Sequence, residues 1–262
     1  MLKQSLWALA AALFFSMMAA CVKLTNGELT TLEMVFYRSL FGVITIGLFV
    51  KRNHLSLKTP HLMGNITRSI LGTLSISVWF FTLGQLPFGT NMTLVYTTPL
   101  FMSVNFIILA LLRHQRAPWG LAAAIIAGFS GITIILQPSF SSDQLWPALL
   151  TLSVALLDLA IYWQMKELGR LQEPSWRIVF YFTCFGTCFG LIGAYLLEDG
   201  LHMPSPEAAL AVLAMGAFAT LGQIATTRSY AYGNMLLSSC LGFSAIPLPR
   251  SSAGSSLMSP LR

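Results

Sequence analysis

The chain has 262 residues, of which 55% are hydrophobic and only 9% are charged, and its mean hydropathy is +0.72. A soluble domain with this composition would expose large apolar patches, so the composition predicts a membrane protein whose solvent is the lipid bilayer. The net charge of +6 does not indicate nucleic-acid binding, because most basic residues lie beside one predicted side of the membrane, as expected for a membrane protein.

Apolar runs of about 20 residues, the length that crosses a bilayer, recur along the chain. We predict eight complete membrane spans, near residues 4–22, 31–50, 65–86, 89–112, 118–137, 145–165, 176–197 and 207–227. The runs are continuously apolar, without the alternation of a barrel strand, and helices satisfy every backbone amide inside the bilayer. The predicted fold class is therefore an all-α polytopic membrane protein.

The charge pattern predicts the orientation, because Lys and Arg near span ends are retained on the cytoplasmic side. With the N-terminus inside, most basic residues fall in or beside cytoplasmic segments: Lys3, Lys51, Arg52, Lys58, Arg68, Arg113, Arg116, Lys166, Arg170, Arg177 and Arg228. Acidic residues collect on the external side: Glu28, Asp143, Glu198, Asp199 and Glu207. The sequence therefore predicts a multi-pass protein with a cytoplasmic N-terminus.

The first span has an alternative interpretation as a signal peptide, because residues 18–21 (MAAC) resemble a lipoprotein cleavage box. Methionine is a poor first residue for such a box. Cleavage would also leave an unpaired set of spans and invert the charge pattern, so we favour a membrane helix.

Cysteines and glycines inside the spans are interpreted as packing residues. Cys184 and Cys188 are four positions apart on one helix face, which is the wrong geometry for a disulfide, and they lack neighbouring metal ligands. Gly186 and Gly190 form a GxxxG step that permits close helix packing. No metal site and no cofactor are predicted.

The second half of the sequence repeats the first at a constant offset. Residues 35–42 read VFYRSLFG, and residues 179–186, 144 positions later, read VFYFTCFG. The same offset aligns Gly72 with Gly216 and Thr82 with Thr226. We predict a first repeat of five helices in residues 1–138 and an incomplete second repeat in residues 139–248. Duplicated membrane bundles are typical of transporters, whose related halves move against each other around a site at their interface.

The C-terminal residues do not complete the second repeat. Residues 235–248 begin a ninth helix, but residues 249–262 (PRSSAGSSLMSPLR) are too polar to finish a crossing. Our hypothesis is a frameshift near Pro249. If the third base of each codon is read with the first two bases of the next codon, Gly254 can become Trp and the Ser and Ala codons become mostly apolar ones. A truncated product that inserts but does not transport, as a subunit or pseudogene product, is therefore an alternative to a transporter.

Several motifs, in this order and spacing, resemble the EamA-like branch of the drug/metabolite transporter superfamily. They are Glu33 with Phe36, Tyr37 and Arg38 in the second span, Gly72 with Trp79, Phe80 and Phe81 in the third, residues 96–101 (YTTPLF) in the fourth, and Gly128 with Gly131 before Pro138 in the fifth. The fourth span departs from the family pattern, because Leu112, Arg113 and His114 stand where Gly-Glu is common.

The resemblance covers residues 1–248 and implies a ten-helix inverted-repeat (5+5) transporter with both termini inside. In this chain the ninth helix would be partial and the tenth missing. The resemblance further implies a protein of the bacterial inner membrane that moves small organic solutes by alternating access. It does not identify the solute.

Two charged residues inside predicted spans are candidates for function. Arg38 lies about 12 Å into its span at 1.5 Å per residue, where an unpaired charge is costly. It is either a polar anchor, for example for a substrate carboxylate, or a structural arginine bonded to backbone carbonyls. Asp158 is a candidate proton carrier, or it is a hydrated residue near the inner end beside Tyr162 and Lys166. The two could also pair with each other across the pathway.

Aromatic and polar side chains inside the spans are candidates for the wall of a solute pathway, because aromatic walls with few polar groups suit organic ligands. They are Tyr37, Trp79, Phe80, Tyr96, Thr97, Tyr162, Tyr181 and Gln223, with Pro99 as a point of helix bending. The alternative for each aromatic residue is that it faces lipid. The expected partners are the bilayer and a small organic solute, and a homodimer is left open.

An intramembrane enzyme is the third hypothesis. The sequence has no HExxH or GxSxG motif and no paired aspartates, and His54, His61, His114 and His202 all fall in predicted loops. We therefore predict no catalytic residues.

Overall fold

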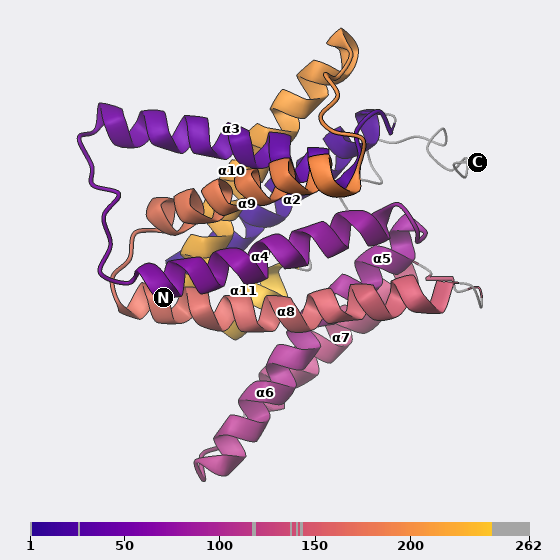
Figure 1. The fold of residues 1–262 in the computed structure, drawn as a ribbon. Helices are drawn as coiled ribbons and strands as arrows, with labels where there is room; N and C mark the ends of the chain where they lie inside the picture. Colours follow the sequence, from indigo (N-terminus) through magenta and orange to yellow (C-terminus); the bar gives the residue numbers. More distant parts are fainter. Residues whose placement is uncertain are drawn as a thin grey trace.

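A computed structural model describes residues 2–25, 27–116, 119–136, 138, 139, 141 and 144–242. These residues form helices joined by short connections, with no strand among them (Figure 1). The helices are α1 (Leu2–Ser5), α2 (Trp7–Leu24), α3 (Thr31–Arg52), α4 (Leu62–Leu83), α5 (Phe88–Val95), α6 (Thr98–Leu112), α7 (Trp119–Leu136), α8 (Leu145–Arg170), α9 (Ser175–Leu197), α10 (Pro206–Tyr232) and α11 (Met235–Gly242).

Seven segments in the described part are long and apolar enough to cross a bilayer. They are Leu2–Val22, α3, α4, Phe88–Leu112, α8, α9 and α10, and α7 holds a shorter apolar stretch at Ala122–Ile135. Large apolar side chains cover the outside of the bundle, such as Leu48, Ile134 and Leu197, which are 62%, 73% and 80% exposed. Such a surface is stable only in lipid, so the all-helical, multi-pass membrane prediction is confirmed.

Helices from the two halves of the chain pack against each other in matching pairs. Helix α2 packs on α10, and α8 packs on α4, while α3 packs on α9. At the offset of 144, α2 corresponds to α8 and α4 to α10, so the first two contacts are equivalent. The start of α3 lies beside the end of α9, and the start of α9 lies beside the α3–α4 connection, so α3 and α9 run antiparallel.

Glycines allow the close contact between α3 and α9. A Cβ atom on Gly190 would lie 2.6 Å from the backbone nitrogen of Phe36. A Cβ on Gly42 would meet the Thr183 side chain at 2.6 Å, and one on Gly186 would meet Ser39 at the same distance. Gly42 and Gly186 are equivalent at the offset of 144, as are Ser39 and Thr183. The predicted packing role of the GxxxG step is therefore confirmed.

The fourth predicted span is broken into α5 and α6. Pro99 has no N–H to bond to the carbonyl of Val95, four residues earlier. The Thr98 Oγ1 hydroxyl donates to Val95 O at 2.8 Å instead, and Thr97 Oγ1 donates to Leu94 O at 2.6 Å. The Thr98 hydroxyl thus satisfies the Val95 carbonyl freed by the break, while Leu94 O accepts from both the hydroxyl and the backbone N–H of Thr97.

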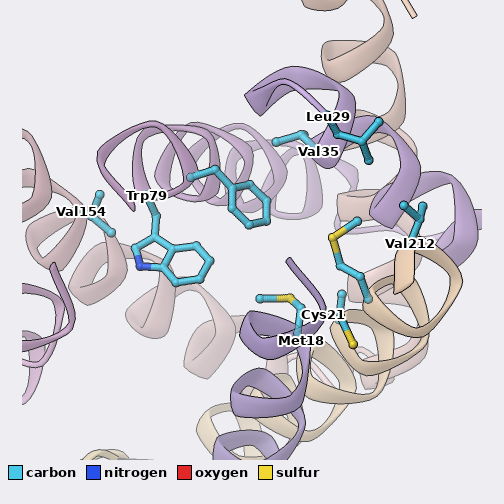
Figure 2. Close-up of a cluster of buried hydrophobic side chains, with 10 residues drawn as sticks. Met18, Cys21, Leu29, Val35, Trp79, Val154 and Val212 are labelled. Carbon is cyan, nitrogen blue, oxygen red and sulfur yellow. The ribbon is translucent and has the colours of Figure 1, made fainter. Parts of the chain in front are cut away.

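A hydrophobic core joins both halves near one end of the bundle. Met18, Val35, Trp79, Val154 and Val212 come from α2, α3, α4, α8 and α10 and pack in one cluster (Figure 2). Phe80 belongs to the same cluster. Five helices that are distant in sequence therefore share one core.

The structure describes only part of the predicted C-terminal region. Helix α11 begins at Met235, where the ninth span was predicted to begin, and is described to Gly242. Residues 243–262, including the tail from Pro249, lie outside the described residues.

Candidate functional site

A cavity of about 90 Å³ lies at the break between α5 and α6. It is lined by Val95, Tyr96, Thr98, Pro99, Asp158, Tyr162, Tyr230, Ser239 and Gly242. These residues come from α5, the break, α6, α8, α10 and α11, so both halves of the chain contribute. Four of the residues predicted from sequence, Tyr96, Pro99, Asp158 and Tyr162, are brought together here.

Asp158 projects from the middle of α8 and is the carboxylate in the cavity wall. Its Oδ1 accepts a hydrogen bond from Ser75 Oγ of α4 at 2.8 Å. One turn along α8, the Tyr162 ring stacks on the Tyr230 ring, with centroids 3.8 Å apart. Lys166 does not reach Asp158, because its Nζ donates to Gly233 O at 2.8 Å.

Two arginines lie around one phenylalanine ring, and one of them, Arg68, interacts electrostatically with Asp158 and Tyr162 of the cavity wall. The guanidinium carbon of Arg68 is 4.1 Å from the centre of the Phe182 ring, and that of Arg38 is 5.7 Å from it. Arg68 Nη2 donates to Gln223 Oε1 at 3.0 Å. This contact joins Gln223 of the second half to Arg68 of the first half.

Arg68, which was expected in or beside a cytoplasmic segment, lies in the second turn of α4 and is buried. Its side chain is only 1% exposed, and it folds against its own helix. Gly72, one turn further along α4, provides the space, since a Cβ there would lie 2.7 Å from Arg68 Nη1. Arg38 is also buried, at 2% exposed, and among the described residues no ion pair joins it to Asp158.

A polar cluster, here termed the α3-start cluster, joins residues 28–33 to residues 198–205. Glu33 accepts from the Thr30 backbone N–H at 2.8 Å, forming a capping box for α3, and it also accepts from the His202 backbone N–H. The Tyr37 hydroxyl donates to His202 O at 2.7 Å. Ser205 N and Oγ donate to the Glu28 carboxylate at 3.1 and 3.0 Å. The start of α3 is thus tied to the α9–α10 connection.

A second cluster, here termed the α9-start cluster, joins residues 56–59 to residues 173–181. Arg177 donates through Nη1 to Glu173 at 3.0 Å and through Nη2 to Ser56 O at 2.8 Å. Thr59 Oγ1 also donates to Glu173. The Tyr181 hydroxyl donates to Leu57 O at 3.0 Å. The start of α9 is thus tied to the α3–α4 connection, at the opposite end of the α3–α9 pair.

The remaining predicted residues lie elsewhere. Trp79 and Phe80 are buried in the hydrophobic core rather than lining the cavity, at 9% and 2% exposed. Thr97 bonds the carbonyl of Leu94 at the helix break. Sequence reasoning missed Phe182 and Arg68, although Phe182 is the repeat equivalent of Arg38 and could have been found from that offset.

A larger hollow of about 330 Å³ lies between the start of α4 and the end of α8, lined by Pro60, His61, Met63, Gly64, Gln164, Glu167, Leu168 and Leu171. It is at one end of the bundle and lacks the buried charges found beside the smaller cavity. We therefore place the candidate site at the smaller cavity, where a helix break, a carboxylate and residues of both halves meet.

The fold and this cavity define a polytopic helical membrane protein with a polar centre at a broken helix. The EamA-like transporter family matches residues 2–137 of the chain, so the chain belongs to that family. The predicted family is thereby confirmed.

Relatives of this chain are also transporters. It is 26% identical to the pseudopaline exporter of Pseudomonas aeruginosa, with 87% of this chain and 78% of that protein covered. It is 27% identical to a riboflavin transporter of Rhizobium johnstonii, with 87% and 74% covered. A solved crystal structure, 17% identical, shares the fold with a TM-score of 0.80 over 97% of this chain and 91% of the other.

Proposed function

We propose that this protein is a secondary transporter of small organic metabolites or drugs that works by alternating access. The observation that carries the proposal is the cavity at the broken helix, walled by both halves of the chain and holding the carboxylate of Asp158. Transporter sites of this kind lie at repeat interfaces, where discontinuous helices expose polar backbone groups to the solute.

The movement that we propose is a rocking of two inverted repeats, residues 1–138 and 139–248, in a ten-helix plan. The antiparallel pairing of α3 with α9 and the equivalent pairings of α2 with α10 and α8 with α4 support it. The α3-start and α9-start clusters lie at opposite ends of α3, about 33 Å apart at 1.5 Å per residue. Releasing one cluster while the other holds would open the cavity to one side of the membrane at a time.

We further propose that Asp158 carries the coupling proton. Its neighbours are the Ser75 hydroxyl, the tyrosine rings of the cavity and the charge of Arg68. A carboxylate held inside the membrane in this way can exchange a proton when water enters from either side. The remaining predicted pathway residues, including Tyr37, Thr97 and Tyr181, are proposed to act at the two ends and at the helix break.

The test is transport by the purified protein in vesicles with an imposed pH gradient. Riboflavin and pseudopaline are the first solutes to try, because relatives of this chain transport them. We expect the gradient to drive transport by the wild type and not by Asp158→Asn. Glu207→Gln, which removes an exposed carboxylate at the start of α10, should respond as the wild type does.

Two outcomes would count against the proposal. An equal response of Asp158→Asn and the wild type would remove Asp158 as the coupling residue. No transport of these or other organic solutes by a folded protein would instead favour the non-transporting alternative.

We also propose a cytoplasmic N-terminus in a bacterial inner membrane. The N-terminus and the connections after α3 and α8 lie at the same end of the bundle (Figure 1). Cysteines introduced at Arg52 and Arg170 should therefore both be labelled from the cytoplasmic side. Labelling from opposite sides would contradict the orientation and the repeat.

A further inference from the structure

The two arginines at Phe182 have more hydrogen-bond donors than the described residues accept from. A guanidinium group carries five N–H donors. Arg68 places one nitrogen on Gln223, but the Nε and Nη1 atoms of both arginines are buried with no hydrogen-bond partner among the described residues. Unpaired donors inside a membrane protein are costly, so these four nitrogens indicate acceptors that the described part of the chain does not supply.

The charge around Phe182 is also unbalanced. The ion pairs of the described residues involve Arg170, Arg177 and His202, and none involves Arg38 or Arg68. Asp158 interacts electrostatically with Arg68, but its hydrogen bond is with Ser75. Two buried positive charges, Arg38 and Arg68, are therefore accompanied by the single carboxylate of Asp158. An uncompensated charge inside a membrane protein is energetically costly.

The positions of the arginines relative to the repeat favour a ligand site over a purely structural role. Arg38 and Phe182 are equivalent at the offset of 144, so one repeat supplies a cation and the other supplies an aromatic ring on which it rests. Gly72 leaves space for Arg68 against the same ring. The ring orders both guanidinium groups, which lowers the entropy lost when a ligand binds.

We propose that Arg38 and Arg68 bind the acidic group of the transported solute, so that the substrates are organic anions carrying a carboxylate or a phosphate. Both groups match the planar fork of a guanidinium with two acceptor oxygens. This inference rests on the proposed transport function and names its substrate class. Both arginines are buried against Phe182, so the anion reaches them when the contact of α3 with α9 opens at one end.

The inference is tested by binding, which does not require transport. Thermal unfolding of the purified full chain in detergent is measured with increasing benzoate, phenyl phosphate or benzamide, at constant ionic strength set with sodium chloride. Benzamide has the shape of benzoate without its charge. A ligand that binds only the folded state raises the unfolding temperature with its concentration. We expect a rise with benzoate, with phenyl phosphate, or with both, and none with benzamide.

Variants locate the effect at the arginines. Arg38→Gln should abolish the rise, whereas Arg170→Gln, which changes an arginine whose side chain is 73% exposed, should keep it. A stronger rise with phenyl phosphate than with benzoate would assign phosphorylated solutes, and the reverse would assign carboxylates.

Three results would overturn the inference: equal rises with benzoate and benzamide, no rise with either anion, or an unchanged rise in Arg38→Gln. The comparison of benzoate with benzamide uses the wild type alone, so it holds even where Arg38→Gln does not fold. Anion binding by a protein that moves no solute would contradict the proposed transport and leave the anion site standing. Transport that is insensitive to the charge of the solute would contradict the anion site only.

Discussion

The two ends of the α3–α9 pair are built on equivalent positions with different chemistry. Tyr37 and Tyr181 are equivalent at the offset of 144, and each hydroxyl donates to a carbonyl in a connection of the other half. Glu33 and Arg177 are also equivalent, but one is a carboxylate that accepts from a backbone N–H and the other is a guanidinium that donates to a backbone carbonyl.

This difference shows that the two halves can keep equivalent contacts at both ends while the charge of a contacting residue changes. The tyrosine bond is retained at both ends because it needs only a carbonyl in the opposing connection. The charged residue can differ because the backbone of a connection offers both N–H donors and carbonyl acceptors. A carboxylate can bind the first and a guanidinium the second. Opposite charges at equivalent places make the ends respond differently to substitution.

The largest effect is expected from breaking the contact on which both ends depend. A methyl group added by Gly190→Ala would lie 2.6 Å from the Phe36 nitrogen, and backbone atoms cannot move aside as a flexible side chain can. We expect a loss of about 3 kcal/mol in the free energy of unfolding, at the upper end of overpacking effects. Thermal or denaturant unfolding in detergent measures it.

Gly47→Ala is the matched control for this change. Gly47 lies on α3, and a Cβ there would meet only the Phe180 ring, at 3.9 Å. The substitution should be neutral or slightly stabilising, because Ala is the better helix former. Equal stability of Gly190→Ala and Gly47→Ala would show that α3 and α9 do not touch as described.

Removing the charged residue at each end separately is expected to have the next largest effect. Arg177→Ala would leave the Glu173 carboxylate, 1% exposed, without its cation, and Glu33→Ala would leave the Thr30 and His202 N–H groups without their acceptor. We expect each to lower the free energy of unfolding by about 2 kcal/mol. Unfolding of the two variants beside the exposed Arg170→Ala, expected within about 0.5 kcal/mol of the wild type, checks this.

The conservative variants sharpen the contrast between the ends. Glu33→Gln keeps one carbonyl oxygen as acceptor and should recover part of the loss. Arg177→Lys offers a point charge in place of a fork and should satisfy only one of the Glu173 and Ser56 acceptors. Equal stability of the alanine and conservative variants at both positions would show that the hydrogen bonds of Glu33 and Arg177 do not stabilise the fold.

The smallest effect is expected from the tyrosine hydroxyls. Tyr37→Phe and Tyr181→Phe each remove one hydrogen bond to a connection and should each cost about 1 kcal/mol. Because the clusters lie at opposite ends of α3, the costs should add in the double variant. Unfolding of both single variants and the double variant measures this, and a cost in only one of them would show that the ties are not equivalent.

Much of the architecture could be predicted from the sequence. The positions of the spans follow from uninterrupted apolar runs, and the repeat follows from the spacing of residues 35–42 and 179–186. The break at Pro99 was expected as a bend, because proline lacks the N–H of a continuous helix. The hydrogen bond from the Thr98 hydroxyl to the freed Val95 carbonyl was not expected, since a threonine hydroxyl inside a helix can equally face other partners.

The candidate site was predictable only in part. Asp158, Tyr96 and Tyr162 were noticed because polar or aromatic residues inside apolar runs are conspicuous. Arg68 was not proposed for the site because a charge near the start of a span usually extends back to the interface, and only the structure places Gly72 and Phe182 around it. Trp79 was expected in a pathway, yet its ring lies in the core with Met18 and Val35 (Figure 2).

Hydropathy identifies the chain as a helical membrane protein, and the spacing of its motifs shows the offset of 144, because both can be read from the order of residues along the chain. Which residues of one half meet those of the other is known only from the folded structure. Those contacts join positions more than one hundred residues apart, such as Arg68 with Gln223 and Tyr37 with His202. They depend on how helices of the two halves pack against each other, and no local pattern of amino acids specifies that packing.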